Sequence, residues 1–112
     1  MQTAKSSELD RIFQALSDPT RRAILRQITR GEKTVSAIAL PHALTFAGVS
    51  KHLKVLEAAR LIGRRKVGIY QMIKLNPEAL KSADQWLRFY EQFWSARLGA
   101  LKDLLEKDED KP

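Results

Sequence analysis

The residues whose types and spacing could do chemistry lie between positions 45 and 71. Within a predicted helix there, Val49, Leu53 and Leu56 recur at the spacing of a face that packs against a core. The opposite face would present small residues and lysines without an acid: Ala47, Gly48, Ser50, Lys51 and Lys54. Such a face can donate hydrogen bonds and neutralise negative charge, which is the chemistry of a polyanion-binding surface.

A second basic group follows on a predicted strand that turns at Val67-Gly68, and its members are Arg64, Arg65 and Lys66. Two interpretations are open at this point. The lysine face and the basic ribbon could be ordinary solvated surface that keeps the protein soluble. Their adjacency favours a polyanion with grooves, because a basic ribbon directly after a helix of this kind suits contacts to the DNA backbone or minor groove.

Catalytic and metal-binding chemistry has little support in the sequence. The chain has no cysteine, which excludes disulfides, thiolate metal sites and cysteine nucleophiles. His42 is expected in a turn, and His52 on the flank of the helix, where it could bond a phosphate or another part of the protein. No serine or carboxylate stands at a spacing that suggests a paired mechanism with either histidine. We therefore predict no enzyme activity, no cofactor and no metal, and assign His52 to the DNA-facing set.

Length and charge set further bounds. With 112 residues the chain suits one compact domain over residues 1–112. A net charge of +7 and a pI of about 10.0 favour nucleic acid or an anionic membrane surface as partner. The start of the sequence lacks a secretory signal, and no segment approaches the roughly 18 apolar residues of a membrane span. We expect a cytoplasmic bacterial protein, associated with the nucleoid when bound to DNA and not with a membrane.

The elements that would position these residues are five helices and one hairpin. Capping residues, glycines and prolines divide the chain into helices over about 7–17, 18–31, 34–41, 45–59 and 77–105. Ser7, Asp18, Thr34 or Ser36, Thr45 and Asn76 are the expected caps. The convincing strand signals are around Gly68, from Leu61 to Leu75. The predicted fold class is mainly α with a two-stranded β wing, and the third and fourth helices would form a winged helix-turn-helix with the fourth in the major groove.

The last predicted helix carries an unusual concentration of aromatic residues. Trp86, Phe89, Tyr90, Phe93 and Trp94 lie within little more than two turns, and leucines continue the apolar surface. This surface is too wide for one face of a small monomer to cover, so dimerisation through the first and last helices is the simplest outlet, although packing against the first helix must take part of it. The predicted interface consists of Leu9, Ile12, Phe13, Leu80, Trp86, Leu87, Tyr90, Phe93, Trp94, Leu98 and Leu101.

Four segments together resemble the ArsR/SmtB family of bacterial winged-helix repressors. They are LSDPTRRAILRQI, VSKHLKVLEAARLI, the basic hairpin, and the ending LNPEALKSADQWLRFYEQFWSARLGALKDLLE. The similarity spans about residues 7–106, and the aromatic ending is similar to metal-independent members related to small autorepressors. The resemblance implies a homodimer that binds an inverted-repeat operator in double-stranded DNA and represses transcription.

The chain departs from the family pattern in three places. The segment SAIAL lacks the Cys-x-Cys type of site that metal sensors carry, and Asp84 in the last helix stands without a histidine partner. Both metal sites are therefore ruled out on ligand chemistry. Arg60 replaces the usual glycine after the fourth helix. A left-handed conformation there would cost on the order of 1 kcal/mol, so we predict a turn of different geometry.

Roles can be assigned to the residues of the predicted site. Ser50 and Lys51 would contact base edges or phosphates, Thr45 would cap the helix, and Gly48 would let the backbone approach DNA. The phosphate contacts would come from Lys54, Arg64, Arg65 and Lys66. Arg21 and Arg22 would contact the DNA backbone or pair with acids such as Asp18. A protein-interaction module that uses the aromatic helix is the alternative function, and the sequence does not identify an inducer.

Overall fold

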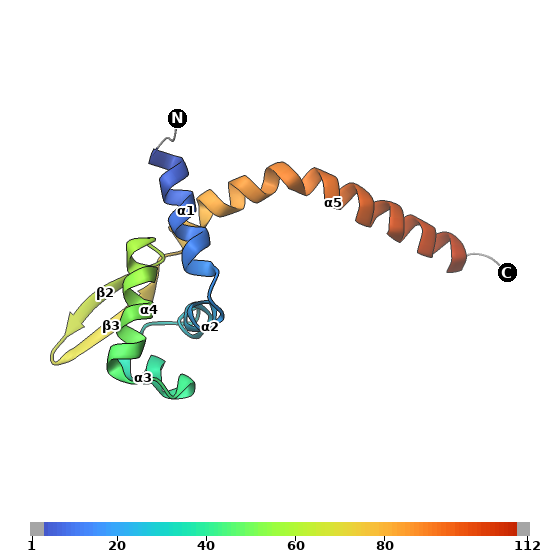
Figure 1. The fold of residues 1–112 in the computed structure, drawn as a ribbon. Coiled ribbons are helices and arrows are strands. Elements are labelled where there is room, and N and C mark those ends of the chain that lie inside the picture. The colour runs from blue at the N-terminus through green and yellow to red at the C-terminus, as the bar shows by residue number, and fades with distance from the viewer. Residues whose placement is uncertain (1–3, 110–112) are drawn as a thin grey trace.

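A computed structural model describes the backbone of residues 4–109 and the side chains of residues 7–107. The elements follow in the order α1 (Ala4–Leu16), α2 (Pro19–Gln27), β1 (Lys33–Thr34), α3 (Val35–Ala39), the 3₁₀ turn η1 (Leu40–His42), α4 (Phe46–Ala58), β2 (Ile62–Val67), β3 (Tyr70–Leu75), the 3₁₀ turn η2 (Pro77–Ala79) and α5 (Leu80–Glu109). Figure 1 shows α1, α2 and α3 gathered around α4 and the β2–β3 hairpin projecting beside it. The predicted fold class, mainly α with a β wing, is confirmed.

Side-chain caps fix where three of the helices begin. In each, a side-chain oxygen accepts a hydrogen bond from the backbone N–H three residues later: Asp18 from Arg21 (2.9 Å), Thr34 from Ala37 (3.1 Å) and Thr45 from Gly48 (3.0 Å). These bonds satisfy N–H groups that the first helical turn leaves without a partner. The helix starts predicted from these residue types are confirmed.

Other predicted boundaries were wrong. Ser7 lies inside α1 and does not cap it. Helix α2 ends at Gln27, before Gly31, because the chain turns there toward β1. Asn76 does not cap the last helix, since its side-chain amide donates to the carbonyl of Arg60 instead (2.8 Å). Helix α5 starts at Leu80 after η2 and continues through the charged residues beyond position 105.

The sheet has three antiparallel strands in the order β1-β3-β2. The predicted two-stranded wing is the β2–β3 hairpin, and β1 is a further short strand that was not predicted. Strand β1 pairs Lys33 with Ile73, and its two residues are too few to show an alternating pattern in the sequence. The hairpin turn is formed by Gly68 and Ile69, with Gly68 at φ +60° as a two-residue turn of this kind requires. The turn predicted at Val67-Gly68 is therefore one residue later, because Val67 still pairs with Tyr70.

One hydrophobic cluster holds α1 to α4, the sheet and the start of α5 together. Val49, Leu53 and Leu56 have no exposed surface, which confirms the predicted inner face of α4. The other fully buried large side chains are Ile12, Ile24, Ile28, Ile38, Leu61 and Ile73. Ile12 was predicted in a dimer interface, but it is enclosed by its own chain and cannot contact a partner.

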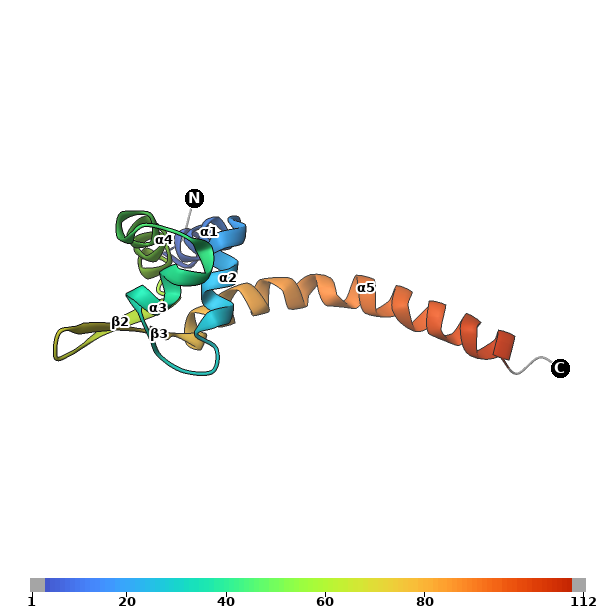
Figure 2. The ribbon, with the colours of Figure 1, turned by 90° about the horizontal axis from the view of Figure 1, so that it is seen from below.

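Helix α5 leaves this body and extends far from it, as Figures 1 and 2 show from two directions. The molecule measures 67 × 43 × 21 Å, and its radius of gyration is 19.3 Å, whereas a compact chain of this length would have about 13 Å. Near its start α5 packs on α1, where the rings of Phe13 and Trp86 meet edge to face at 5.4 Å. The rest of α5 is covered by no other element of the described chain.

The turn from α4 to the wing has a left-handed residue at its centre, Arg60 with φ +60°. The N–H of Arg60 donates to the carbonyl of Glu57 (2.9 Å), and that of Leu61 donates to the carbonyl of Leu56 (3.0 Å). These two bonds form a Schellman motif, which needs a left-handed residue at this position. The expectation that Arg60 would change the turn geometry was therefore wrong. The paired carbonyls and the burial of Leu61 offset the cost of the left-handed backbone.

Replacing Arg60 by glycine tests this strain. Arg60→Gly removes the left-handed penalty and should raise the free energy of unfolding by about 1 kcal/mol, measured by urea denaturation at fixed protein concentration. Ala58→Gly is the matched control, because Ala58 is exposed and helical and gains nothing from glycine; we expect it to lower stability by roughly 0.5–1 kcal/mol. Destabilisation of similar size by both changes would contradict the strain at Arg60.

Candidate nucleic-acid interface

The solvent-facing side of α4 is the largest part of the predicted site. Ala47, Lys51 and Lys54 are exposed, Ser50 is half-buried, and the first turn carries no acid. A helix N-terminus also carries a partial positive charge from its free N–H groups. This side of α4 therefore combines a helix N-terminus with two lysines that pair with no acid among the described residues. Its width and charge suit the major groove of DNA.

Gly48, predicted to let the backbone approach DNA, lies close to the turn that precedes α4. It is half-buried, and a Cβ added to it would lie 3.3 Å from Oγ1 of Thr45 and 3.5 Å from Cδ2 of Leu44. Such contacts are tight for a methyl group. Gly48 therefore leaves room for the cap and for the turn that precedes α4.

The wing arginines point to opposite faces of the hairpin, as alternation along a strand requires. Arg64 faces α4, where its Nε donates to Glu57 (2.7 Å) and its Nη1 donates to Gln71 (3.2 Å). Arg65 faces away and makes a two-fold contact with the carboxylate of Glu32, at 3.0 and 2.7 Å. The hydrogen bonds and charge of Arg65 hold the pKa of Glu32 below its ordinary value. The predicted basic trio is therefore divided between two surfaces.

Lys66 is exposed near the tip of the hairpin and pairs across the strands with Gln71. By alternation it lies on the same face as Arg64. The face of the wing that looks toward α4 thus carries Arg64 and Lys66. Arg65 belongs to the reverse face and is already bound to an acid.

His52, Arg21 and Arg22 face the α1–α2 corner. Nδ1 of His52 lies 3.8 Å from the carboxylate of Asp18. Arg21 donates to the carbonyls of Ala15 (2.8 Å) and Gln14 (3.0 Å), and Arg22 donates to that of Leu16 (2.8 Å), so both guanidinium groups cap the C-terminal end of α1. Neither side chain forms the ion pair with Asp18 that the sequence left open.

Apolar residues that the sequence analysis did not assign to the site lie beside these basic ones. A shallow hollow of about 390 Å³ separates the N-terminal turn of α4 from the wing, and Phe46, Ser50, Arg64, Ile69, Tyr70 and Gln71 line it together with the start of α3. Phe46 is 70% exposed and Ile69 87%. The sequence feature that could have indicated Phe46 as a site residue is its position directly after the Thr45 cap, in a run of small and basic residues.

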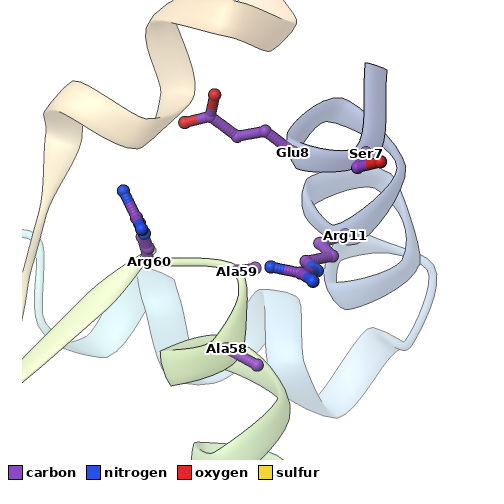
Figure 3. A pocket seen from close by; sticks show the side chains of 6 residues that line it. All are labelled: Ser7, Glu8, Arg11, Ala58, Ala59 and Arg60. Carbon is purple, nitrogen blue, oxygen red and sulfur yellow. The ribbon is translucent and has the colours of Figure 1, made fainter. Parts of the chain in front are cut away.

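A second hollow, of about 300 Å³, lies at the other end of α4. Figure 3 shows Glu8 and Arg11 of α1 and Arg60 of the turn around it. It is removed from the N-terminal turn of α4. Within the described part of the chain, no three histidine or acidic side chains gather as a metal site would require, and no helix is long and apolar enough to cross a membrane.

Comparisons with known proteins agree with this geometry. A family model for a helix-turn-helix domain matches residues 16–65. The chain is 35% identical over 101 residues to the HTH-type transcriptional regulator Rv2034 of Mycobacterium tuberculosis, covering 90% of this chain and 92% of the relative. A crystal structure of an ArsR family transcriptional regulator superposes with a TM-score of 0.74 at 34% identity, covering 85% of this chain and 97% of the other.

The chain belongs to the ArsR family of transcriptional regulators. It is also similar to the transcriptional repressor SdpR of Bacillus subtilis, with 32% identity over 79 residues that cover 70% of this chain and 88% of SdpR. The solution structure of a homodimeric winged helix-turn-helix DNA-binding domain from Mycobacterium bovis shares the fold, with a TM-score of 0.62 at 24% identity, covering 82% of this chain and 91% of that domain.

Membership of the ArsR family confirms the resemblance read from the sequence. The protein is a transcriptional regulator with a winged helix-turn-helix fold, in which α3 and α4 form the helix-turn-helix and the β2–β3 hairpin is the wing. Its relatives are transcriptional regulators, which confirms the prediction that it is not an enzyme.

The Asp18 cap gives this ArsR regulator a pH-dependent contribution to stability. The hydrogen bond from the N–H of Arg21, helped by the charges of Arg21 and His52, holds the pKa of Asp18 below its ordinary 3.8. The unfolded chain then takes up this proton first as the pH falls. The stabilisation of the folded state by the Asp18 carboxylate is therefore fully present above pH 3.8, and it is lost as the pH falls through the lower pKa of the folded state.

Substitution of Asp18 separates the charge from the cap. Asp18→Asn keeps a capping oxygen without a titrating group, so its stability deficit relative to wild type should shrink when urea unfolding is measured at pH 3 instead of pH 7. Asp18→Ala removes the cap as well and should remain less stable than Asp18→Asn at both pH values. A deficit of Asp18→Asn that grows on acidification would contradict the assigned direction.

Proposed function

We propose that this ArsR regulator is a homodimeric repressor that binds an inverted-repeat operator in double-stranded DNA without a metal. The observation that carries the proposal is the acid-free first turn of α4, with exposed Lys51 and Lys54, beside a wing whose facing side is also basic. Recognition helices of this class enter the major groove with their N-terminal residues against base edges. The wing then lies along the backbone toward the minor groove.

Each contact of the proposed site follows from these positions. Ser50 and Lys51 would meet base edges or the phosphates beside them, while Lys54 and Lys66 would neutralise phosphates. Arg64 would exchange its bond with Glu57 for a phosphate oxygen, which binds a guanidinium in the same geometry as a carboxylate. Thr45 would keep the first turn in place. Ala47 would let that turn approach the groove.

The proposed dimer explains the uncovered face of α5. Its exposed apolar side chains are Trp86, Leu87, Phe89, Tyr90, Phe93, Trp94, Leu98, Leu101, Leu104 and Leu105. The predicted interface lacked Phe89, Leu104 and Leu105, and we include them because they are exposed apolar side chains of the same helix. Leu9, Phe13 and Leu80 are partly buried against the core and would line its edge. A two-fold pair of α4 helices would meet half-sites one turn apart, roughly 34 Å.

Repression and independence from metal complete the proposal. SdpR is a repressor by name, and the M. bovis domain with this fold is a homodimer by description. A dimer seated on an operator would obstruct transcription by occupancy alone, so no catalytic step is needed. The absence of ligating side chains in the sequence segments where metal-sensing members carry them supports the metal-free assignment.

A protein-interaction module is the second candidate, because the aromatic face of α5 could also hold a different protein. The two candidates differ in one observation. A DNA-binding regulator enriches a defined sequence from genomic fragments, whereas the interaction module would enrich none and would form a stoichiometric complex with one partner through α5.

Lys51 provides a direct test of the DNA-binding surface. Lys51→Ala should weaken binding to an operator selected from genomic fragments by at least about fivefold, or roughly 1 kcal/mol, when labelled duplex is titrated at fixed salt. Lys102→Ala removes the same charge from the distal part of α5 and should leave affinity nearly unchanged. Equal losses in both variants would remove Lys51 from the site.

Phe93 provides the test of the dimer. Wild type should have twice the chain mass of 12.8 kDa by light scattering at micromolar concentration. Phe93→Glu places a charge in the exposed apolar face and should give the monomer, because an unpaired charge is costly to bury. Gln92→Glu adds the same charge at the neighbouring exposed position and should stay dimeric. A monomeric wild type would refute the proposed dimer.

A further inference from the structure

Phe46 is a large apolar side chain at the first position of α4, and the fold of α4 does not depend on it. It is 70% exposed, whereas the inner face of α4 is completely buried without it. The helix start is already closed by the Thr45 cap (3.0 Å), and Leu44 packs against the core. Alanine would serve the fold of α4 as well, since phenylalanine is a poorer helix former.

The surroundings of Phe46 point to a ligand with both charged and apolar groups. Phe46 and Ser50 form one wall of the hollow between α4 and the wing, and Ile69, Tyr70 and Gln71 belong to the wing on its other side. The apolar side chains of Phe46, Ile69 and Tyr70 thus lie between the basic residues of α4 and those of the wing. Exposed apolar patches with polar rims are typical of binding surfaces.

The major groove offers one apolar group that matches this patch. Each base pair there shows donors and acceptors, and only thymine adds a C5-methyl group, which apolar side chains such as phenylalanine contact. The phenyl ring has no hydrogen-bonding group with which to distinguish the other bases. Its place in the first turn of the recognition helix is where base edges are reached.

We propose that Phe46 recognises the C5-methyl group of a thymine in each half-site of the operator. The inference rests on the proposed function, since it requires α4 to lie in the major groove. Ile69 cannot take this role from the wing tip, because the wing reaches toward the minor groove, where thymine shows no methyl group. Phe46 is therefore a specificity-determining residue at one defined position of each half-site.

Removal of single methyl groups from DNA tests the inference. An operator is first selected from genomic fragments with the wild-type protein, and each thymine is then replaced by deoxyuridine, which lacks only the C5-methyl group. Wild type should lose about fourfold in affinity for each methyl removed at one symmetric pair of positions, the equivalent of about 0.8 kcal/mol per buried methyl. Phe46→Ala should bind more weakly and show no further loss at that pair.

Two controls keep this result specific. Leu40→Ala removes another exposed apolar side chain that does not line the hollow, and it should retain the full sensitivity to methyl removal. Thermal unfolding of Phe46→Ala should match wild type, because the ring is mostly exposed.

The outcomes separate the inference from the proposed function. If the selected operator has no methyl-sensitive thymine, or if Phe46→Ala keeps the same sensitivity, the role of Phe46 is refuted while operator binding stands. If selection with wild type enriches no sequence, both the operator-binding function and the inference are refuted. Loss of methyl sensitivity in Phe46→Ala alone supports both.

Discussion

The hydrogen bonds around Arg60 fix the wing relative to the recognition helix. Two backbone bonds close the end of α4 over a left-handed residue, and Asn76 donates from its side chain to the carbonyl of Arg60 while its own N–H donates to the carbonyl of Leu61 (2.8 Å). Asn76 follows β3, so the end of the second strand is tied to the same turn from which the first strand starts. Both strands of the hairpin are thereby anchored at the end of α4, and helix and wing would approach DNA as one unit.

The two arginines of the wing, Arg64 and Arg65, form ion pairs with nearby acids in the absence of DNA. Arg64 bonds to Glu57 of α4, and Arg65 bonds to Glu32 of the loop before β1. Exposed pairs of this kind contribute little to stability in water, typically under 1 kcal/mol. They hold each guanidinium in a defined direction at small cost, and in the proposed complex a phosphate would replace Glu57 as the partner of Arg64. Within the described part of the chain, Lys51, Lys54 and Lys66 form no ion pair, so they leave positive charge on α4 and on the wing.

The features that could be predicted from sequence are those that local spacing determines. The inner face of α4 follows from helical periodicity, and three helix starts follow from Asp18, Thr34 and Thr45. Features that depend on distant residues were missed. Strand β1 exists because β3 pairs with it, and the direction of Arg65 depends on an acid 33 positions earlier. The burial of Ile12 likewise depends on how α1 is enclosed.

The turn at Arg60 and the exposure of Phe46 show two further limits of such reasoning. The free-energy cost of a left-handed backbone, taken for Arg60 alone, argued against this conformation. The backbone hydrogen bonds to the carbonyls of Leu56 and Glu57, together with the hydrogen bond from the Asn76 side chain, outweigh that cost. No role was predicted for Phe46, which stands three residues before Val49 at a spacing that also suits a core residue. Only the enclosure of Val49 by neighbouring elements shows that the core is complete without it.

Helix α5 carries its apolar residues in an 11-residue repeat along the uncovered face. The repeat relates Leu87 to Leu98, Tyr90 to Leu101 and Trp94 to Leu105. Eleven residues complete three turns at about 3.67 residues per turn, close to the 3.6 of an α-helix, so the stripe runs nearly parallel to the axis and does not wind around it. A repeat of this kind would let two paired α5 helices slide by one period, about 16 Å. The two copies of the repeat differ in side-chain volume, however, because Tyr90 and Trp94 in the first copy correspond to Leu101 and Leu105 in the second. In the proposed dimer, a slipped pairing would leave voids beside the leucines, so this difference in size would favour a single alignment.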